Sequence, residues 1–138
     1  MIDPLEAVIN YLAADSELAV LVGERVAAKH RYGKEWQTSQ PALTVLLDGG
    51  TPELYVPMQT VRLETRSYAT TQAGAMRGWR RLMEISRHTQ RAVSPTSQGA
   101  ALLFWFTQAS GPSLLFDREL GLDFVLGFFE AAVGEAAL

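Results

Sequence analysis

The residue types that most often carry catalysis are scarce in this sequence, and their spacing matches no known catalytic arrangement. The chain has two histidines, His30 and His88, on different expected elements, and it has no cysteine. A cysteine nucleophile paired with a histidine base is therefore excluded. No serine lies in a Gly-x-Ser-x-Gly turn, and Gly49-Gly50 is not followed by the Lys-Ser/Thr pair of a phosphate-binding loop. We expect no enzyme activity, no catalytic residue and no cofactor.

Three carboxylates near the end of the chain are the acidic group to consider for a metal ion. Asp117, Glu119 and Asp123 lie in or beside an expected turn. Calcium-binding loops place their oxygen ligands at fixed positions, and this group has neither that spacing nor a histidine. Because solvated acids are common in turns, we expect no metal site here.

A group of arginines is the strongest charge feature. Five of them lie on or just after an expected helix, with one acid among them: Arg77, Arg80, Arg81, Arg87 and Arg91, with Glu84. They could form a solvated helix face, contact acidic residues of a neighbouring subunit, or bind phosphates. We favour the solvated face and expect no specific nucleic-acid binding, because no exposed aromatic platform accompanies the charges. The whole chain has a net charge of -3.

The totals indicate one domain, residues 1–138, large enough for a core without disulfides. Asp3 and Glu6 interrupt the start of the chain, so we expect no signal peptide. The longest apolar runs are too short to cross a bilayer, and we expect a soluble protein made in the cytoplasm. A hydrophobic fraction of 48% with a mean hydropathy of +0.04 is slightly high for a soluble monomer. Extra apolar surface of this kind often forms an interface.

Helix signals open the chain. Asp3 provides an N-cap carboxylate, Pro4 follows at the first helical position, and Glu6 lies three residues after the cap. Apolar residues at helical spacing predict a helix over about 4–14 and a helical turn over about 16–22.

A second amphipathic helix is predicted over 72–88, with an apolar inner face and a charged outer face. Gly74 and Gly78 each weaken a helix by about 1 kcal/mol relative to alanine. Because they are spaced four residues apart, we expect them to allow close packing on a sheet.

Strands are predicted at about 25–29, 42–47, 60–69, 100–108 and 122–133. Turns are predicted at 48–50 and 110–112, and a turn-rich connection at 94–99. The run 60–69 alternates most clearly. Its inward set is Val61, Leu63, Thr65 and Ser67, and its outward set is Arg62, Glu64, Arg66 and Tyr68. We predict an α+β fold, with a mixed, mostly antiparallel sheet of four to five strands and two helices packed on one face.

The last two predicted strands are apolar on both faces. Leu102, Phe104 and Phe106 alternate with Leu103 and Trp105. In the final strand, Leu122, Phe124, Leu126 and Phe128 alternate with residues that include Val125 and Phe129. A strand with water on one side should alternate between apolar and polar residues. Either these strands are covered on both sides within the monomer, or a neighbouring subunit covers one face.

A loop at 51–59 contains large apolar side chains, among them Leu54, Tyr55 and Met58. It occupies the tip of an extended hairpin. The tip could fold back onto its own core or form an arm that reaches a partner.

Short motifs along almost the whole chain resemble one family. They are Leu5-Glu6-Ala7-Val8 and Leu21-Val22-Gly23-Glu24-Arg25-Val26, then Gln40-Pro41-Ala42-Leu43-Thr44-Val45, the strand at 61–68 leading into the helix at 73–85, and the final hairpin of 102–106 and 122–129. This pattern resembles the phage and prophage tail-completion family, which includes the lambda-type tail terminators, or tail-to-head joining proteins. Trp79 and the arginine-rich face are not features of that pattern.

The resemblance implies a virion protein at the junction of tail and head, assembled in the host cytoplasm. Its partners would be itself, as a homohexameric ring that leaves room for DNA to pass, the tail-tube protein, and a head-side connector or stopper protein. The ring would cap the tube and stop its growth. Another neck protein, such as a head-closure or connector adaptor, is the alternative. Our candidates for subunit or tail-tube contacts are Leu54, Tyr55, Met58, Arg62, Glu64, Arg66, Trp105 and Phe129.

Overall fold

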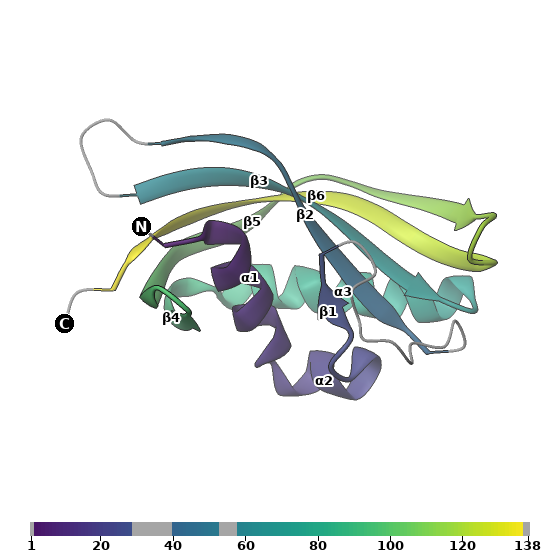
Figure 1. The fold of residues 1–138 in the computed structure, drawn as a ribbon. Coiled ribbons are helices and arrows are strands. Elements are labelled where there is room, and N and C mark those ends of the chain that lie inside the picture. The colour runs from purple at the N-terminus through teal and green to yellow at the C-terminus, as the bar shows by residue number, and fades with distance from the viewer. Residues whose placement is uncertain (1, 29–39, 53–57, 137–138) are drawn as a thin grey trace.

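The computed structural model describes residues 2–28, 40–52 and 58–136. Within them, three helices lie on one side of a curved six-stranded sheet (Figure 1). The helices are α1 (Pro4–Ala13), α2 (Ser16–Val22) and α3 (Gln72–His88). The strands are β1 (Val26–Ala27), β2 (Ala42–Pro52), β3 (Met58–Ala69), β4 (Gln90–Thr96), β5 (Gly99–Asp117) and β6 (Leu122–Glu135).

Side-chain caps begin each helix where the sequence predicts them. The Asp3 carboxylate accepts the backbone N–H groups of Leu5 and Glu6, and Asp15 accepts that of Leu18 at 2.8 Å. Thr71 Oγ1 accepts the N–H of Gly74 at 3.0 Å to start α3. These bonds satisfy donors that the first helical turn leaves without an intrahelical partner. None of the helices in the described ranges is long and apolar enough to cross a membrane.

The sheet order is β1-β2-β3-β6-β5-β4. Among the described strands, β1 and β2 pair in parallel and the other neighbours are antiparallel. The mixed, mostly antiparallel α+β prediction is therefore confirmed. The predicted number of elements was too small, because α2 is a full helix and β4 was taken for a turn-rich connection.

Two predicted turns are instead irregular parts of longer strands. Asp48-Gly49-Gly50 lies inside β2, where the pairing with β3 shifts register between Leu47 and Gly50. Ser110-Gly111-Pro112 lies inside β5, whose pairing with β6 shifts on both sides of Ser110. Glycine and proline indicated a break in the chain, and the structure accommodates them as bulges that bend a continuing strand.

The core lies between the helices and one face of the sheet. Phe106 and Phe129 are both fully buried, and their rings stack with centroids 4.6 Å apart. Trp79 of α3 approaches Phe129, with ring centroids 5.2 Å apart. Burying one such side chain stabilises the fold by about 1.5–3 kcal/mol.

Glycines allow α3 to approach the sheet closely. A Cβ atom at Gly78 would overlap the Ser67 hydroxyl, and one at Gly127 of β6 would overlap the Trp79 ring. The expected role of Gly74 and Gly78 in close packing is confirmed, because a Cβ at Gly74 would lie 2.9 Å from the Ala69 Cβ.

Candidate interaction surface

One face of the sheet has no helix over it among the described residues, since α1, α2 and α3 all lie on the other side (Figure 1). We call it the open face. Strand pairing places Arg62, Glu64 and Arg66 of β3 opposite Glu130, Phe128 and Leu126 of β6, respectively. The open face comprises Leu46, Arg62, Glu64, Arg66, Trp105, Leu115, Phe124, Leu126 and Phe128.

Arginine side chains of β3 lie over the aromatic rings of β6. The Arg62 guanidinium is 4.7 Å from the centroid of Phe128, and that of Arg66 is 5.3 Å from the centroid of Phe124. Arg62 also pairs with Asp48 at 3.1 Å, and Arg66 lies 3.5 Å from a Glu64 oxygen. Cation–π contacts of this kind contribute roughly 0.5–1 kcal/mol at exposed sites. The open face therefore presents ordered charges on an apolar base.

Tyr68 forms part of that base: it lies on the outward side of β3 as predicted, but its side chain is buried there by its neighbours. It is 1% exposed and packs in a small apolar cluster with Leu122 and Phe124, its ring centroid 5.1 Å from that of Phe124. Burial raises the pKa of the Tyr68 hydroxyl. The neighbouring Tyr68 side chain, more than any other group, raises the pKa of the Arg66 guanidinium.

Trp105 reaches the open face because β5 is irregular. The β5–β6 pairing shifts between Leu103 and Trp105. Leu103 is fully buried on the helix side, whereas Trp105 is 38% exposed and pairs across the sheet with Ala132. A bulge reverses the alternation of side chains, which no count of odd and even positions could anticipate.

The outer half of β5 is exposed on both faces. Every residue from 107 to 116 is exposed, including Leu114, Leu115 and Phe116. Beyond Trp105 the pairing with β4 ends, so β5 becomes the edge of the sheet among the described residues. The sequence prediction missed this segment because Gly111-Pro112 suggested a turn. The Leu-Leu-Phe run was the signal that could have revealed it.

The structure places the remaining candidate residues in different environments. Met58 begins β3 on the same face as Arg62 and is half-buried. Leu54 and Tyr55 lie outside the described residues. Phe129 is in the core at 0% exposure, so its proposed place on a contact surface was wrong. The faces of β6 were assigned in reverse: the Phe129 side meets the helices, and the Phe124–Phe128 side is open.

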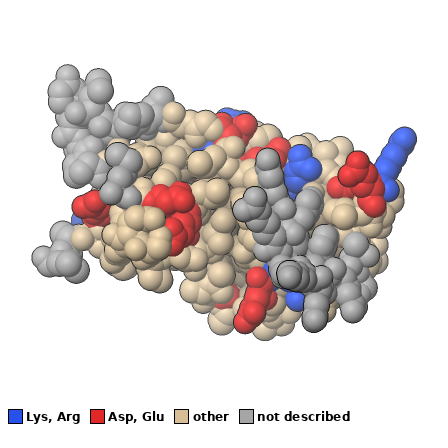
Figure 2. All heavy atoms as spheres, in the orientation of Figure 1, with Lys and Arg blue, Asp and Glu red and all other residues tan. Residues whose placement is uncertain are grey.

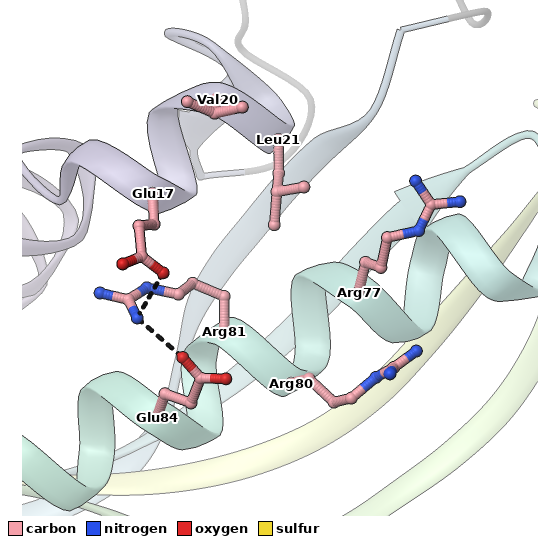
Figure 3. A pocket seen from close by; sticks show the side chains of 7 residues that line it. All are labelled: Glu17, Val20, Leu21, Arg77, Arg80, Arg81 and Glu84. Atoms are coloured by element: carbon pink, nitrogen blue, oxygen red, sulfur yellow. Dashed lines mark hydrogen bonds and ion pairs between the residues drawn. The ribbon is translucent and has the colours of Figure 1, made fainter.

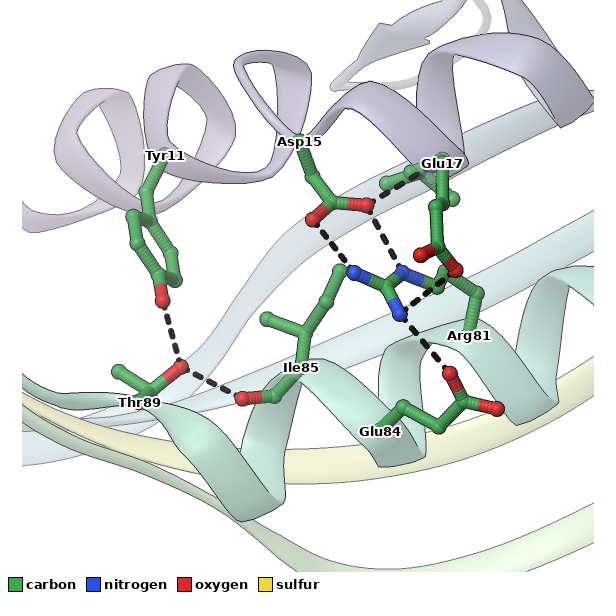
Figure 4. Close-up of polar contacts among 8 residues, drawn as sticks. Tyr11, Asp15, Glu17, Arg81, Glu84, Ile85 and Thr89 are labelled. Atoms are coloured by element: carbon green, nitrogen blue, oxygen red, sulfur yellow. Dashed lines mark hydrogen bonds and ion pairs between the residues drawn. The ribbon is translucent and has the colours of Figure 1, made fainter.

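The arginines of α3 have two different environments. Arg81 donates from Nε and Nη2 to the two oxygens of Asp15 at 2.9 and 2.8 Å, and it also pairs with Glu17 and Glu84 (Figure 4). The hydrogen bonds that Arg81 donates to Asp15 lower the pKa of Asp15 and raise the pKa of Arg81. Arg81 thus joins α2 to α3 within one chain, and it is not free to bind phosphate.

Arg77 and Arg80 point away from this cluster and make no ion pair with the described residues (Figure 3). They line an open cavity of about 400 Å³ between α2 and α3, together with Val20 and Leu21. Lys, Arg, Asp and Glu are scattered over the face shown in Figure 2, which carries no continuous basic patch.

No metal centre emerges from the described residues, which contain no group of three or more potential ligands. Asp117 accepts the backbone N–H groups of Glu119 and Leu120, so its carboxylate shapes the β5–β6 turn. His88 is exposed at the end of α3, and His30 lies outside the described ranges.

No protein-family model matches this sequence, and a comparison with curated proteins finds no match. Among solved structures, the fold is similar to a chain of a structure described as the virion of a native gene transfer agent particle. The TM-score is 0.56 at 15% identity, over 88% of this chain and 87% of the other. At this identity the similarity concerns the fold, and it extends over nearly the full length of both chains.

Proposed function

We propose that this protein is a non-enzymatic structural component of a phage-like virion, and more specifically a ring-forming tail terminator. In this role a ring of subunits caps the tail tube, ends its polymerisation and offers a docking surface to the head-side connector. The fold similarity to a chain of a gene transfer agent virion supports the broader assignment. The family resemblance of the sequence motifs supports the narrower one.

The observation that carries the proposal is the open face. Trp105 and Leu115 are 38% and 43% exposed there, beside Leu126 and Phe128, which are half-buried. Arg62, Glu64 and Arg66 lie along the same surface. An apolar area with ordered charges is typical of a protein contact, in which the charges set register and specificity more than affinity. We assign this face to the next subunit or to the tail tube.

The test replaces both Arg62 and Arg66 with Glu. We expect the double variant to remain folded, because these exposed ion pairs contribute about 0–1 kcal/mol each. It should lose ring closure in sedimentation or light scattering, and it should no longer limit the length of tubes grown from the tail-tube protein. The matched control reverses two exposed arginines elsewhere, Arg87 at the end of α3 and Arg91 in β4.

An unchanged native mass and unchanged tube capping in the Arg62/Arg66 variant would exclude the open face as the assembly surface. Another neck protein, such as a head-closure or connector adaptor, is the second candidate, since the matched virion chain does not separate the two. Binding of the wild-type protein to filled heads, with no effect on tube length, would favour the adaptor.

A further inference from the structure

Two surfaces outside the open face combine exposed apolar side chains with charged ones, and both lie on the helix side of the sheet. The first is the cavity between α2 and α3. The second is the helix-side face of the β5–β6 hairpin near its turn.

The cavity has an apolar wall and a charged rim, where Arg81 pairs with Glu17 and Glu84 and leaves Arg77 and Arg80 as the cations without an ion pair among the described residues. Val20 is 85% exposed on α2, and Leu21 points from the same helix toward α3 (Figure 3). Arg77 and Arg80 stand on the opposite wall without an ion pair among the described residues. A second cavity of about 290 Å³ shares Val20, Leu21 and Arg77 and continues toward Gly74 and Gly78. Together they form a groove that can hold a bulky apolar side chain beside a carboxylate.

The hairpin carries that combination. Phe116 is 58% exposed and Leu114 is 42% exposed, and both lie on the helix side of β5. Phe116 is the cross-strand partner of Asp123, so an aromatic ring and a carboxylate leave the sheet side by side. Glu119 is exposed in the adjoining turn, where Arg118 is the one basic residue.

Both surfaces face the helix side of the sheet, but they lie over different strands, and none of the hairpin residues 114–123 lines the groove. The groove lies over β2 and β3, since Pro41 and Ser67 line its second cavity. The hairpin strand β5 lies beyond β6 from them in the sheet order. A contact between the two surfaces therefore requires two copies of the chain. Each copy would use one surface toward each neighbour, which is the heterologous arrangement that closes into rings.

We propose that the β5–β6 hairpin of one copy docks in the α2–α3 groove of the next, with Phe116 against Val20 and Leu21, and with Asp123 and Glu119 facing Arg77 and Arg80. This contact deepens the proposed ring function by naming both halves of a subunit interface. It also explains why large apolar side chains are exposed at Val20 and at Phe116.

Disulfide trapping tests the contact directly, because the chain has no cysteine of its own. A size-tagged Val20→Cys protein is mixed with untagged Phe116→Cys under mild oxidation, and the mixed dimer is resolved on a non-reducing gel. The control partner is Val93→Cys, an apolar residue 63% exposed on β4 and outside both surfaces. We expect the Phe116 partner to cross-link at least about tenfold faster, equivalent to 1.4 kcal/mol of preference.

Charge reversal provides a second test of the same contact. Arg77→Glu with Arg80→Glu in the Val20→Cys protein should abolish the preference for Phe116→Cys. Glu119→Arg with Asp123→Arg in the partner should restore it. Equal cross-linking rates to the Phe116 and Val93 positions would overturn the proposed contact. The contact would also be overturned if the charge-reversed variants unfold normally and still prefer the Phe116 partner.

Experiments can contradict the proposed hairpin–groove contact and the proposed ring function independently of each other. If the wild-type protein forms a ring that caps tubes while the trapped pair does not form, this interface is wrong and the proposed function stands. If the pair forms but the protein grows into open chains and never limits tubes, the interface stands and the terminator assignment is wrong.

Discussion

Arg81 contacts three carboxylates, and two of them belong to a different helix. Its pairing with Asp15 uses two parallel hydrogen bonds, and both side chains are 19% exposed. Bidentate pairs that are partly shielded from water are stronger than ordinary surface pairs. Asp15 also caps α2 through the Leu18 N–H. One carboxylate therefore starts a helix and holds it against another.

The Asp15→Asn variant should separate these two roles, because asparagine retains the cap but loses the charge. We expect a loss of about 1 kcal/mol in the free energy of unfolding. Asp3→Asn at the cap of α1, where Asp3 has no ion pair among the described residues, is the matched control. Equal losses in both variants would assign the effect to capping alone.

The same pair predicts a dependence on acid. The pKa of Asp15 is lower in the folded chain than its ordinary value of 3.8, so the unfolded chain binds a proton more readily. The stabilisation is complete above pH 3.8 and is lost as the pH falls through the folded-state pKa. Chemical unfolding at several pH values below 4 should show a shallower decline for Asp15→Asn than for the wild type. Parallel curves would contradict this assignment.

At the scale of elements, α3 sits on the sheet where glycine replaces a side chain. The Trp79 ring lies against Gly127 of β6, and a Cβ there would overlap it. Gly111 of the neighbouring strand also lies against Gly127, so the ring has little space to move aside. Close packing of this kind makes an added methyl group costly.

Gly127→Ala should therefore lower the free energy of unfolding by about 1–3 kcal/mol. In a Trp79→Leu background the same substitution should cost less than half as much, because the ring that it would overlap is gone. Denaturant unfolding of the four proteins in this double-mutant cycle measures the coupling. Strictly additive losses in the free energy of unfolding would show that the Trp79 ring does not restrict the space at Gly127.

Local patterns predicted the elements well where one signal dominated. Helix α3 begins and ends as predicted, and the alternation of β3 placed Leu63 and Thr65 correctly. Errors occurred where tertiary pairing overrode local chemistry, as at Gly49-Gly50 and Gly111-Pro112. Of the residues on the open face, the sequence predicted those of β3 but not the arrangement of β6. The β3 residues were found from alternation, but the inward position of Phe129 depends on which face the helices cover. No periodicity in β6 itself encodes that choice.

At the scale of the whole molecule, the described residues form three helices that cover one face of the sheet and leave the other face without a helix. Leu115 lies on this open face as the cross-strand partner of Phe124, yet 43% of it is exposed. If its role is assembly, a charge there should disturb contacts between molecules more than it disturbs folding. Substitutions at exposed sites usually change stability by no more than about 0.5 kcal/mol.

Leu115→Lys should therefore unfold at nearly the wild-type denaturant concentration but form less assembled protein in sedimentation and limit tube length poorly. Ala73→Lys, at an exposed position of α3 on the helix side of the sheet, should leave both unfolding and assembly nearly unchanged. The physical reason is that lysine at an interface must be desolvated without a partner, whereas lysine on a free surface remains hydrated. A loss of more than about 1 kcal/mol in the isolated Leu115→Lys chain would instead place this side chain in the core. Normal assembly of that variant would show that the contact surface does not extend to the outer half of β5.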